Sequence, residues 1–267
     1  MSRTPDLLLV GAGHMGGALL KGWLAAGRAC VAVVEPDPAP WLRKDRRVTL
    51  FKSVEEARGR YRACVVALKP QILKTEAPRL APIAETGTLM ISIAAGTTIR
   101  SLARAWSRKA RIVRAMPNLP GQIAKGISAL YAPANVPAKD RALAQSLLAA
   151  LGQTVWVSRE GLIDSVTAVS GSGPAYVFLL VEALAAAAQA EGLPPDTAKR
   201  LARATITGAG ALLECDPAEA TTLRQGVTSP GGTTEAALAV LMAEDGLAAL
   251  MARAVAAANR RARELGR

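Results

Sequence analysis

The stretch of residues 226–234, GVTSPGGTT, contains the residue types of an anion-binding loop. Gly231 and Gly232 carry no Cβ and expose consecutive N–H groups, while Pro230 stiffens the turn. A helix predicted to begin near Thr234 would add the positive end of its dipole. Consecutive amides at a helix N-terminus suit a carboxylate or another anion. Taken alone, the same stretch also fits an ordinary Gly-Pro turn between two helices.

A second glycine-rich loop lies near the N-terminus. Gly11, Gly13 and Gly16 directly follow a short apolar run and open a helical pattern, with His14 and Met15 between them. In this context the spacing Gly-x-Gly-x-x-Gly is typical of dinucleotide binding. The first glycine permits a tight turn, the second lets a pyrophosphate approach the backbone, and the third lets the helix pack on the sheet. We therefore expect these five residues to contact a dinucleotide.

Glu35 stands about twenty residues beyond this loop, where an acidic side chain can accept a hydrogen bond from the ribose 2′-hydroxyl. A carboxylate there would repel the 2′-phosphate of NADPH, which favours NADH. Arg43 and Lys44 follow closely and could compensate that phosphate. The residues therefore do not decide between NADH and NADPH as the preferred cofactor. If the side chain of Glu35 points away from the loop, it does not bear on that preference.

The remaining reactive side chains argue against several chemistries. His14 is the only histidine, and its place in the predicted phosphate loop argues against a dehydrogenase that uses histidine for proton transfer. Cys64 lies in a strand-like run with no histidine nearby, which argues against nucleophilic catalysis. Cys30, Cys64 and Cys215 are widely spaced and odd in number, so we expect neither a disulfide framework nor a metal site, and we expect Cys30 and Cys64 to be buried.

The elements that must position these loops change character along the chain. Short β-branched runs alternate with helical patterns in the first half and predict strands at residues 7–10, 30–34, 48–51, 64–68, 89–93, 111–115, 128–131 and 155–157. Such alternation predicts parallel βαβ units. After residue 160 the chain turns to alanine-rich helices, with residues 216–219 resembling a capping box. We expect an α/β dinucleotide-binding domain at residues 1–160 and an all-α domain at residues 161–267.

The composition fits a globular protein that binds small anions. The 267 residues carry a formal charge of +12, but the arginines are spread along the chain and only 3% of residues are aromatic, which disfavours nucleic-acid binding. The apolar run 175–181 ends at Glu182, so we expect no transmembrane helix. The N-terminal residues lack the pattern of a signal peptide, which favours the cytoplasm.

Six motifs together carry a resemblance to a known family. They are GAGHMG at 11–16, ALKPQ at 67–71, ISIAAG at 91–96, RAMPN at 114–118, SGSGPAY at 170–176 and TSPGGTT at 228–234. Through nearly its whole length the chain resembles the pyrroline-5-carboxylate reductases, which make proline. The resemblance implies an N-terminal Rossmann-like domain, a C-terminal helical domain that dimerises, and a homodimer or a larger ring of dimers. Leu119 and Gly121 depart from the family pattern, where threonine and alanine are commoner.

The resemblance also implies residue roles. Reduction of the cyclic imine 1-pyrroline-5-carboxylate needs a hydride from NADPH or NADH and one proton at the ring nitrogen, which a hydroxyl can supply. By resemblance, Thr234 would hydrogen-bond that nitrogen. The substrate carboxylate would be held around Ser229, Gly231, Gly232 and Thr233. The cofactor would lie beside Ala67, Lys69, Pro70 and Asn118.

Alternatives remain at this point. Thr234 could instead be a helix N-cap, and Lys69 and Asn118 could be solvated loop residues. A β-hydroxyacid-dehydrogenase-like reductase shares the domain plan, but its catalytic lysine has no counterpart after Gly173, where Tyr176 and its neighbours follow. A non-catalytic dinucleotide sensor would keep the first glycine loop without needing the second.

Overall fold

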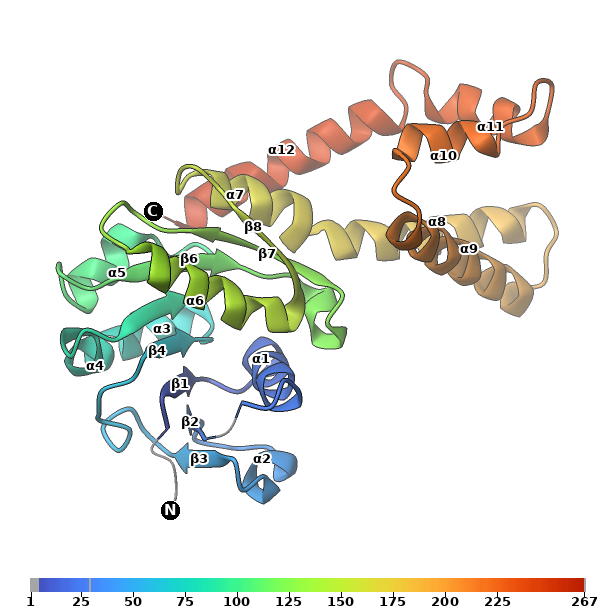
Figure 1. Ribbon diagram of the computed structural model, residues 1–267. Coiled ribbons are helices and arrows are strands. Elements are labelled where there is room, and N and C mark those ends of the chain that lie inside the picture. The colour runs from blue at the N-terminus through green and yellow to red at the C-terminus, as the bar shows by residue number, and fades with distance from the viewer. Residues whose placement is uncertain (1–4, 29, 267) are drawn as a thin grey trace. The chain divides into compact units, whose positions relative to one another are not determined.

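The computed structural model describes residues 5–28 and 30–266 and is shown in Figure 1. Contacts divide the chain into two compact units, one made of Met1–Gly171 with Ala258–Arg267 and the other of Ser172–Ala257. By this division, residues 161–171 and the end of the last helix belong to the first unit, although the sequence places a domain boundary at residue 160. The helix α7 (Leu162–Val166) gives the reason, because Asp164 within it pairs with buried Arg114 of strand β6.

An eight-stranded sheet forms the centre of the first unit, in the order β3-β2-β1-β4-β5-β6-β7-β8. All neighbouring strands are parallel except β6 and β7. The strands are β1 (Leu7–Val10), β2 (Val31–Val34), β3 (Val48–Phe51), β4 (Ala63–Val66), β5 (Leu89–Ser92), β6 (Ile112–Met116), β7 (Gly126–Tyr131) and β8 (Gly152–Trp156). Each corresponds to a run predicted from the sequence.

Helices cover both faces of this sheet (Figure 1). They are α1 (His14–Ala25), α2 (Pro40–Lys44), α3 (Pro70–Glu76), α4 (Ala81–Glu85), α5 (Ile99–Ala105), α6 (Ala138–Leu148) and α7, with short 3-10 turns between some of them. Alternation along β1 produces two cores: Leu7 and Leu9 pack with α1 and α6, while Leu8 and Val10 pack with α3, α4 and α5. Full burial of β1 on both faces explains its uninterrupted apolar sequence.

The three cysteines differ in their surroundings, and all are free thiols. Cys64 is fully buried in β4, as expected, and burial raises the pKa of its thiol. Cys30 departs from the expectation of a buried strand residue. It precedes β2 with a positive φ of 62° and is only half-buried. Cys215 is exposed.

The second unit is all-helical, as the sequence predicts. It contains α8 (Gly173–Ala190), α9 (Pro195–Cys215), α10 (Ala220–Gly226), α11 (Thr233–Leu241) and most of α12 (Leu247–Leu265). The predicted capping box at residues 216–219 is wrong. Asp216 ends α9 and accepts a hydrogen bond from the amide of Ala218 at 2.8 Å, so this segment is a turn, and α10 begins only at Ala220.

Apolar side chains cover the outside of this unit instead of filling a core. Within it only Ala185, Ala198 and Ala202 are buried hydrophobics, whereas Phe178 and Leu179 of α8 are 54% and 63% exposed. The helical stretch Leu162–Ala190 is long and apolar enough to cross a membrane by length and composition alone. The expectation of no transmembrane helix, which rests on Glu182 interrupting the apolar run, stays a prediction. A surface of this kind calls for a partner.

Candidate active site and cofactor site

The first glycine loop connects β1 to α1 and leaves space where a dinucleotide would lie. Gly11 has a φ of +90°, and its amide donates to the carbonyl of Val34 at 2.9 Å. A Cβ on Gly16 would lie 2.0 Å from the carbonyl oxygen of Gly11, whereas a Cβ on Gly13 would meet nothing within 4 Å. The protein itself therefore requires glycine at positions 11 and 16. The open space at Gly13 fits the close approach of a pyrophosphate.

The N-terminus of α1 supplies the charge for that anion. Gly13 is the N-cap, no side chain caps the helix, and the first turn holds no acidic residue. The first amides of α1 and the positive end of its dipole are therefore available. Of the two residues between the glycines, His14 is exposed at this helix start, while Met15 packs against the core beneath the sheet.

Glu35 points toward the glycine loop. One carboxylate oxygen accepts the amide of Ala12 at 2.7 Å, and the other accepts the amide of Asp37 at 3.4 Å. The side chain is thereby fixed between the ends of β1 and β2. It lines a cavity of about 760 Å³ together with Asp37, Arg43 and Lys44. Both the acidic residue and the nearby cations noted in the sequence thus face one space.

A second cavity, of about 420 Å³, lies at the carboxyl ends of the central strands. Its lining includes Gly11, Gly13, Glu35, Ala67 and Lys69. The strand order reverses between β1 and β4, and the crevice beyond such a switch point is where open α/β sheets bind ligands. Five residues from three predicted segments therefore meet in one cavity.

Other predicted cofactor residues take structural positions. Pro70 is the first residue of α3, directly after the N-cap Lys69, where its fixed φ suits a helix start. Asn118 accepts the amide of Ile127 at 2.9 Å through Oδ1 and precedes the 3-10 turn Leu119–Ile123. This bond holds the connection between β6 and β7, so the sequence-based cofactor role of Asn118 stays a prediction.

Sequence reasoning did not single out every residue of the cavity. Lys52 and Ser53 line it directly after β3, and Arg79 lines it from the 3-10 turn Ala77–Leu80. The strand predicted at residues 48–51 could have indicated Lys52 and Ser53, because the residues after a parallel strand lie at the edge of the sheet where ligands bind. Arg79 had no such signal, since its place depends on how the turn after α3 folds.

The second glycine loop lies between α10 and α11 in the other unit. Gly231 has a φ of +71°, and its amide donates to Oε2 of Glu235 at 2.7 Å. The amide of Gly232 donates to the carbonyl of Ser229 at 3.0 Å, and a Cβ on Gly232 would lie 2.5 Å from the hydroxyl of Ser229. The loop is thus held by its own hydrogen bonds and by close packing that only glycine permits.

Its free donors lie at the start of α11. Gly232 is the N-cap, so Thr234 is a half-buried residue of the first turn, and the interpretation of Thr234 as the N-cap is wrong. Along the described part of the chain, nothing accepts a hydrogen bond from the amides of Thr233 and Thr234. The loop thus offers two helix-start amides and a threonine hydroxyl, the donors that an anionic group needs.

Family models match both halves of the chain. Residues 160–265 match the description "Pyrroline-5-carboxylate reductase dimerisation", and residues 7–96 match "NADP oxidoreductase coenzyme F420-dependent". The first match covers the all-helical unit, and the second covers all the residues that line the cavity of about 420 Å³. Along the chain, an NAD(P)-binding module is therefore followed by an oligomerisation module.

Named relatives agree over nearly the full length. The chain is 40% identical to the pyrroline-5-carboxylate reductase of Pseudomonas aeruginosa, with 98% of this chain and 97% of that protein covered. It is 37% identical to that of a Synechocystis strain, with 98% of each covered.

Solved structures agree as well. The structure of a pyrroline-5-carboxylate reductase from Coxiella burnetii superposes with a TM-score of 0.91 at 35% identity, covering 99% of this chain and 100% of that one. The Plasmodium falciparum enzyme, solved with NADP bound, gives a TM-score of 0.81 at 28% identity over the whole of both chains. With a Rossmann-like unit, a helical dimerisation unit and relatives of this similarity, the chain belongs to the pyrroline-5-carboxylate reductase family.

Proposed function

We propose that this protein reduces 1-pyrroline-5-carboxylate to L-proline. A hydride goes to the imine carbon and a proton goes to the ring nitrogen, so that the C=N double bond becomes a C–N single bond with one hydrogen added at each end. The observation that carries the proposal is family membership over 98% of the chain, combined with an intact carboxylate loop at residues 228–234. A dinucleotide sensor would not need that loop, and a β-hydroxyacid dehydrogenase would need a lysine after Gly173 that this chain lacks.

The cofactor would occupy the cavity at the carboxyl ends of the strands. When bound there, NADH or NADPH supplies the hydride. Gly11, Gly13 and Gly16 with His14 and Met15 form the turn and helix start that hold the pyrophosphate. Glu35 would accept a hydrogen bond from the adenosine ribose. The loops beside the rest of the cofactor would be formed by Ala67, Lys69, Pro70 and Asn118.

The substrate would bind at the start of α11. The free amide of Thr233 and the turn formed by Ser229, Gly231 and Gly232 would hold the carboxylate. Charge-assisted hydrogen bonds of this kind contribute about 1.5–3 kcal/mol each. The hydroxyl of Thr234 would donate to the ring nitrogen and hold the proton there. No stronger acid is needed, because an imine is readily protonated near neutral pH.

Gly231 and Gly232 support this site in a particular way. Their own amides are occupied by Glu235 and Ser229, so their part would be to shape the loop. The left-handed φ of Gly231 and the close contact of Gly232 with Ser229 present the neighbouring residues to the substrate.

We also propose a homodimer, or a ring of such dimers, as the working assembly. The dimerisation module and the exposed apolar surface of α8 support it. A cytoplasmic location fits the use of a diffusible cofactor and substrate. The even spread of arginines and the scarcity of aromatics support a protein that does not bind nucleic acid.

The direct test is oxidation of NADH and, separately, of NADPH in the presence of 1-pyrroline-5-carboxylate. We expect turnover by the wild type and a loss in kcat of roughly tenfold to a thousandfold for Thr234→Ala. Thr234→Ser keeps the hydroxyl and should recover most of that loss. Wild-type turnover with an undiminished alanine variant would retain the reductase and remove Thr234 as the donor. Cofactor binding without any turnover would refute the proposed reaction.

A further inference from the structure

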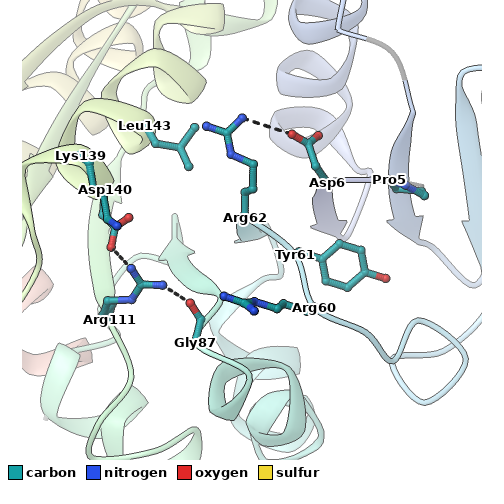
Figure 2. Close-up of a pocket in the computed structure, with 10 residues that line it drawn as sticks. All are labelled: Pro5, Asp6, Arg60, Tyr61, Arg62, Gly87, Arg111, Lys139, Asp140 and Leu143. Carbon is teal, nitrogen blue, oxygen red and sulfur yellow. Dashed lines mark hydrogen bonds and ion pairs between the residues drawn. The ribbon is translucent and has the colours of Figure 1, made fainter. Parts of the chain in front are cut away.

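A separate pocket lies at the opposite edge of the sheet, where the parallel strands begin. Asp6, Arg62 and Arg111 directly precede β1, β4 and β6, and Gly87 stands just before β5. Because β1, β4, β5 and β6 are neighbours in the sheet, their amino ends bring these residues together. They line a cavity of about 570 Å³ with Arg60 and Lys139, among others (Figure 2).

Positive charge dominates this amino-edge pocket. Four cationic side chains, Arg60, Arg62, Arg111 and Lys139, face two anionic ones, Asp6 and Asp140. The pair between Arg62 and Asp6 is 3.4 Å long and largely exposed, so water screens much of it. In the described part of the chain, no ion pair joins Arg60 or Lys139 to an acidic group. The pocket is left with an excess of two positive charges.

Arg111 is already held in place at the wall of this space. Its guanidinium donates to the carboxylate of Asp140, whose side chain is only 9% exposed, and to the carbonyl of Gly87 (Figure 2). Because these two partners already fix the side chain, Arg111 loses less conformational entropy when it binds a ligand than a free arginine would. The remaining donors of its planar fork suit a phosphoryl or carboxylate group.

Helix α6 adds to the same field. Lys139 and Asp140 lie in its first turn, the helix has eleven residues, and no side chain caps its N-terminus. The positive end of the helix dipole therefore lies beside the pocket. Asp140 offsets part of this charge, yet its carboxylate is already engaged by Arg111.

The shape and lining favour a small ligand over a nucleic acid. Tyr61 is the aromatic residue of the lining, but its side chain is 9% exposed and its hydroxyl donates to the carbonyl of Ala57 at 2.8 Å. It offers no open face for stacking of a base. Cations from two strand ends and one helix start surround one space, which suits a compact group with several acceptor oxygens.

We propose that the amino-edge pocket binds a small anion bearing one or two phosphoryl groups. Two phosphoryl groups or one phosphate dianion would balance the excess charge, and the cavity has room for either. The pocket is distinct from the cofactor cavity, which lies at the carboxyl ends of the same strands, so both ligands can be bound at once.

Calorimetric titration of the full-length protein tests this proposal. Saturating NAD⁺ is present throughout, so that added phosphoryl groups cannot enter the glycine loop of the cofactor site. The probes are inorganic pyrophosphate, inorganic phosphate and glycerol 3-phosphate, which separate free phosphates from a phosphate ester. We expect saturable binding of at least one probe, with a rise in melting temperature.

Two double variants locate the binding. Arg60→Ala with Lys139→Ala removes two exposed cations from the pocket and should weaken binding at least tenfold. Arg100→Ala with Arg104→Ala removes the same charge from the exposed side of α5 and should change binding by less than about twofold. Equal weakening by both double variants, or no saturable binding by the wild type, would overturn the proposal. Basal reductase turnover should be unchanged in both and serves as the check on folding.

Discussion

In the proposed cofactor site, the carboxylate of Glu35 would set the charge at the point where NADH and NADPH differ. Its bond to the amide of Ala12 fixes it beside the glycine loop, and a 2′-phosphate would approach it closely. We therefore expect the wild type to prefer NADH. Glu35→Gln keeps an oxygen for Ala12 while removing the charge, and should lower the ratio of kcat/KM for NADH to that for NADPH by roughly tenfold, mainly through tighter NADPH binding.

Asp37→Asn is the matched control for this prediction. Asp37 lines the same cavity and lies 3.8 Å from Arg43, but its side chain is fully exposed, so solvent screens its charge and weakens this ion pair. The control should shift the ratio by less than about twofold. A wild type that prefers NADPH, with the preference unchanged in Glu35→Gln, would show that Arg43 and Lys44 dominate the site.

Burial should also separate the reactivity of two cysteines. Desolvation raises the pKa of Cys64, so its thiol stays neutral in the folded protein at pH values where an exposed cysteine forms thiolate. A thiol reagent at pH 8 to 9, roughly the ordinary cysteine pKa, should therefore label exposed Cys215 quickly and Cys64 only after unfolding. Mass spectrometry of peptides from native and urea-treated protein measures this. Rapid native labelling of Cys64 would mean that β4 opens readily.

At the scale of an element, substitutions at two glycines in the turn from β1 into α1 should affect stability and ligand binding differently. Gly16→Ala would place a methyl group against the carbonyl of Gly11, forcing the backbone to move. We expect it to destabilise the protein by about 1–3 kcal/mol and to abolish tight cofactor binding. A methyl group on Gly13→Ala meets no protein atom within 4 Å, so stability should be nearly unchanged. Cofactor binding should weaken at least tenfold, because the methyl group would occupy the space proposed for the pyrophosphate.

Urea denaturation and fluorescence titration with NADH measure the two effects for both variants. The two substitutions are chemically identical and three residues apart, so each is the control for the other. Full cofactor affinity in Gly13→Ala would remove the pyrophosphate from this position. A fully stable Gly16→Ala would show that the turn relaxes easily.

Much at the scale of elements could be predicted from the sequence, because the deciding signals are local. Apolar strand runs predicted the sheet, and the spacing of Gly11, Gly13 and Gly16 predicted the glycine turn between β1 and α1. The sequence did not predict that Glu235 occupies the amide of Gly231, since that contact depends on the exact start of α11. Nor did it predict the buried pairing of Arg114 with Glu160 and Asp164, which joins residues far apart in the chain.

At the scale of the whole molecule, the helical unit is incomplete alone. A single chain leaves Phe178, Leu179 and Leu180 of α8 about half exposed or more. Apolar side chains so exposed over one helix favour either a second subunit or a membrane. The match to a dimerisation family model favours the subunit. The apolar composition that makes Leu162–Ala190 long and apolar enough for a membrane span would then be the composition of the proposed interface between protomers.

A charge placed on this surface should prevent assembly. Leu179→Glu would bury an unpaired carboxylate at an apolar interface at a cost of several kcal/mol, which corresponds to at least a hundredfold increase in the dissociation constant of the dimer. Leu179→Met conserves volume and polarity and should assemble as the wild type does. Sedimentation velocity at micromolar concentration should show the dimer or larger species for the wild type and the methionine variant, and monomer for the glutamate variant. An unchanged assembly of Leu179→Glu would mean that this face of α8 lies outside the interface, whereas a monomeric wild type that binds lipid vesicles would assign the face to a membrane.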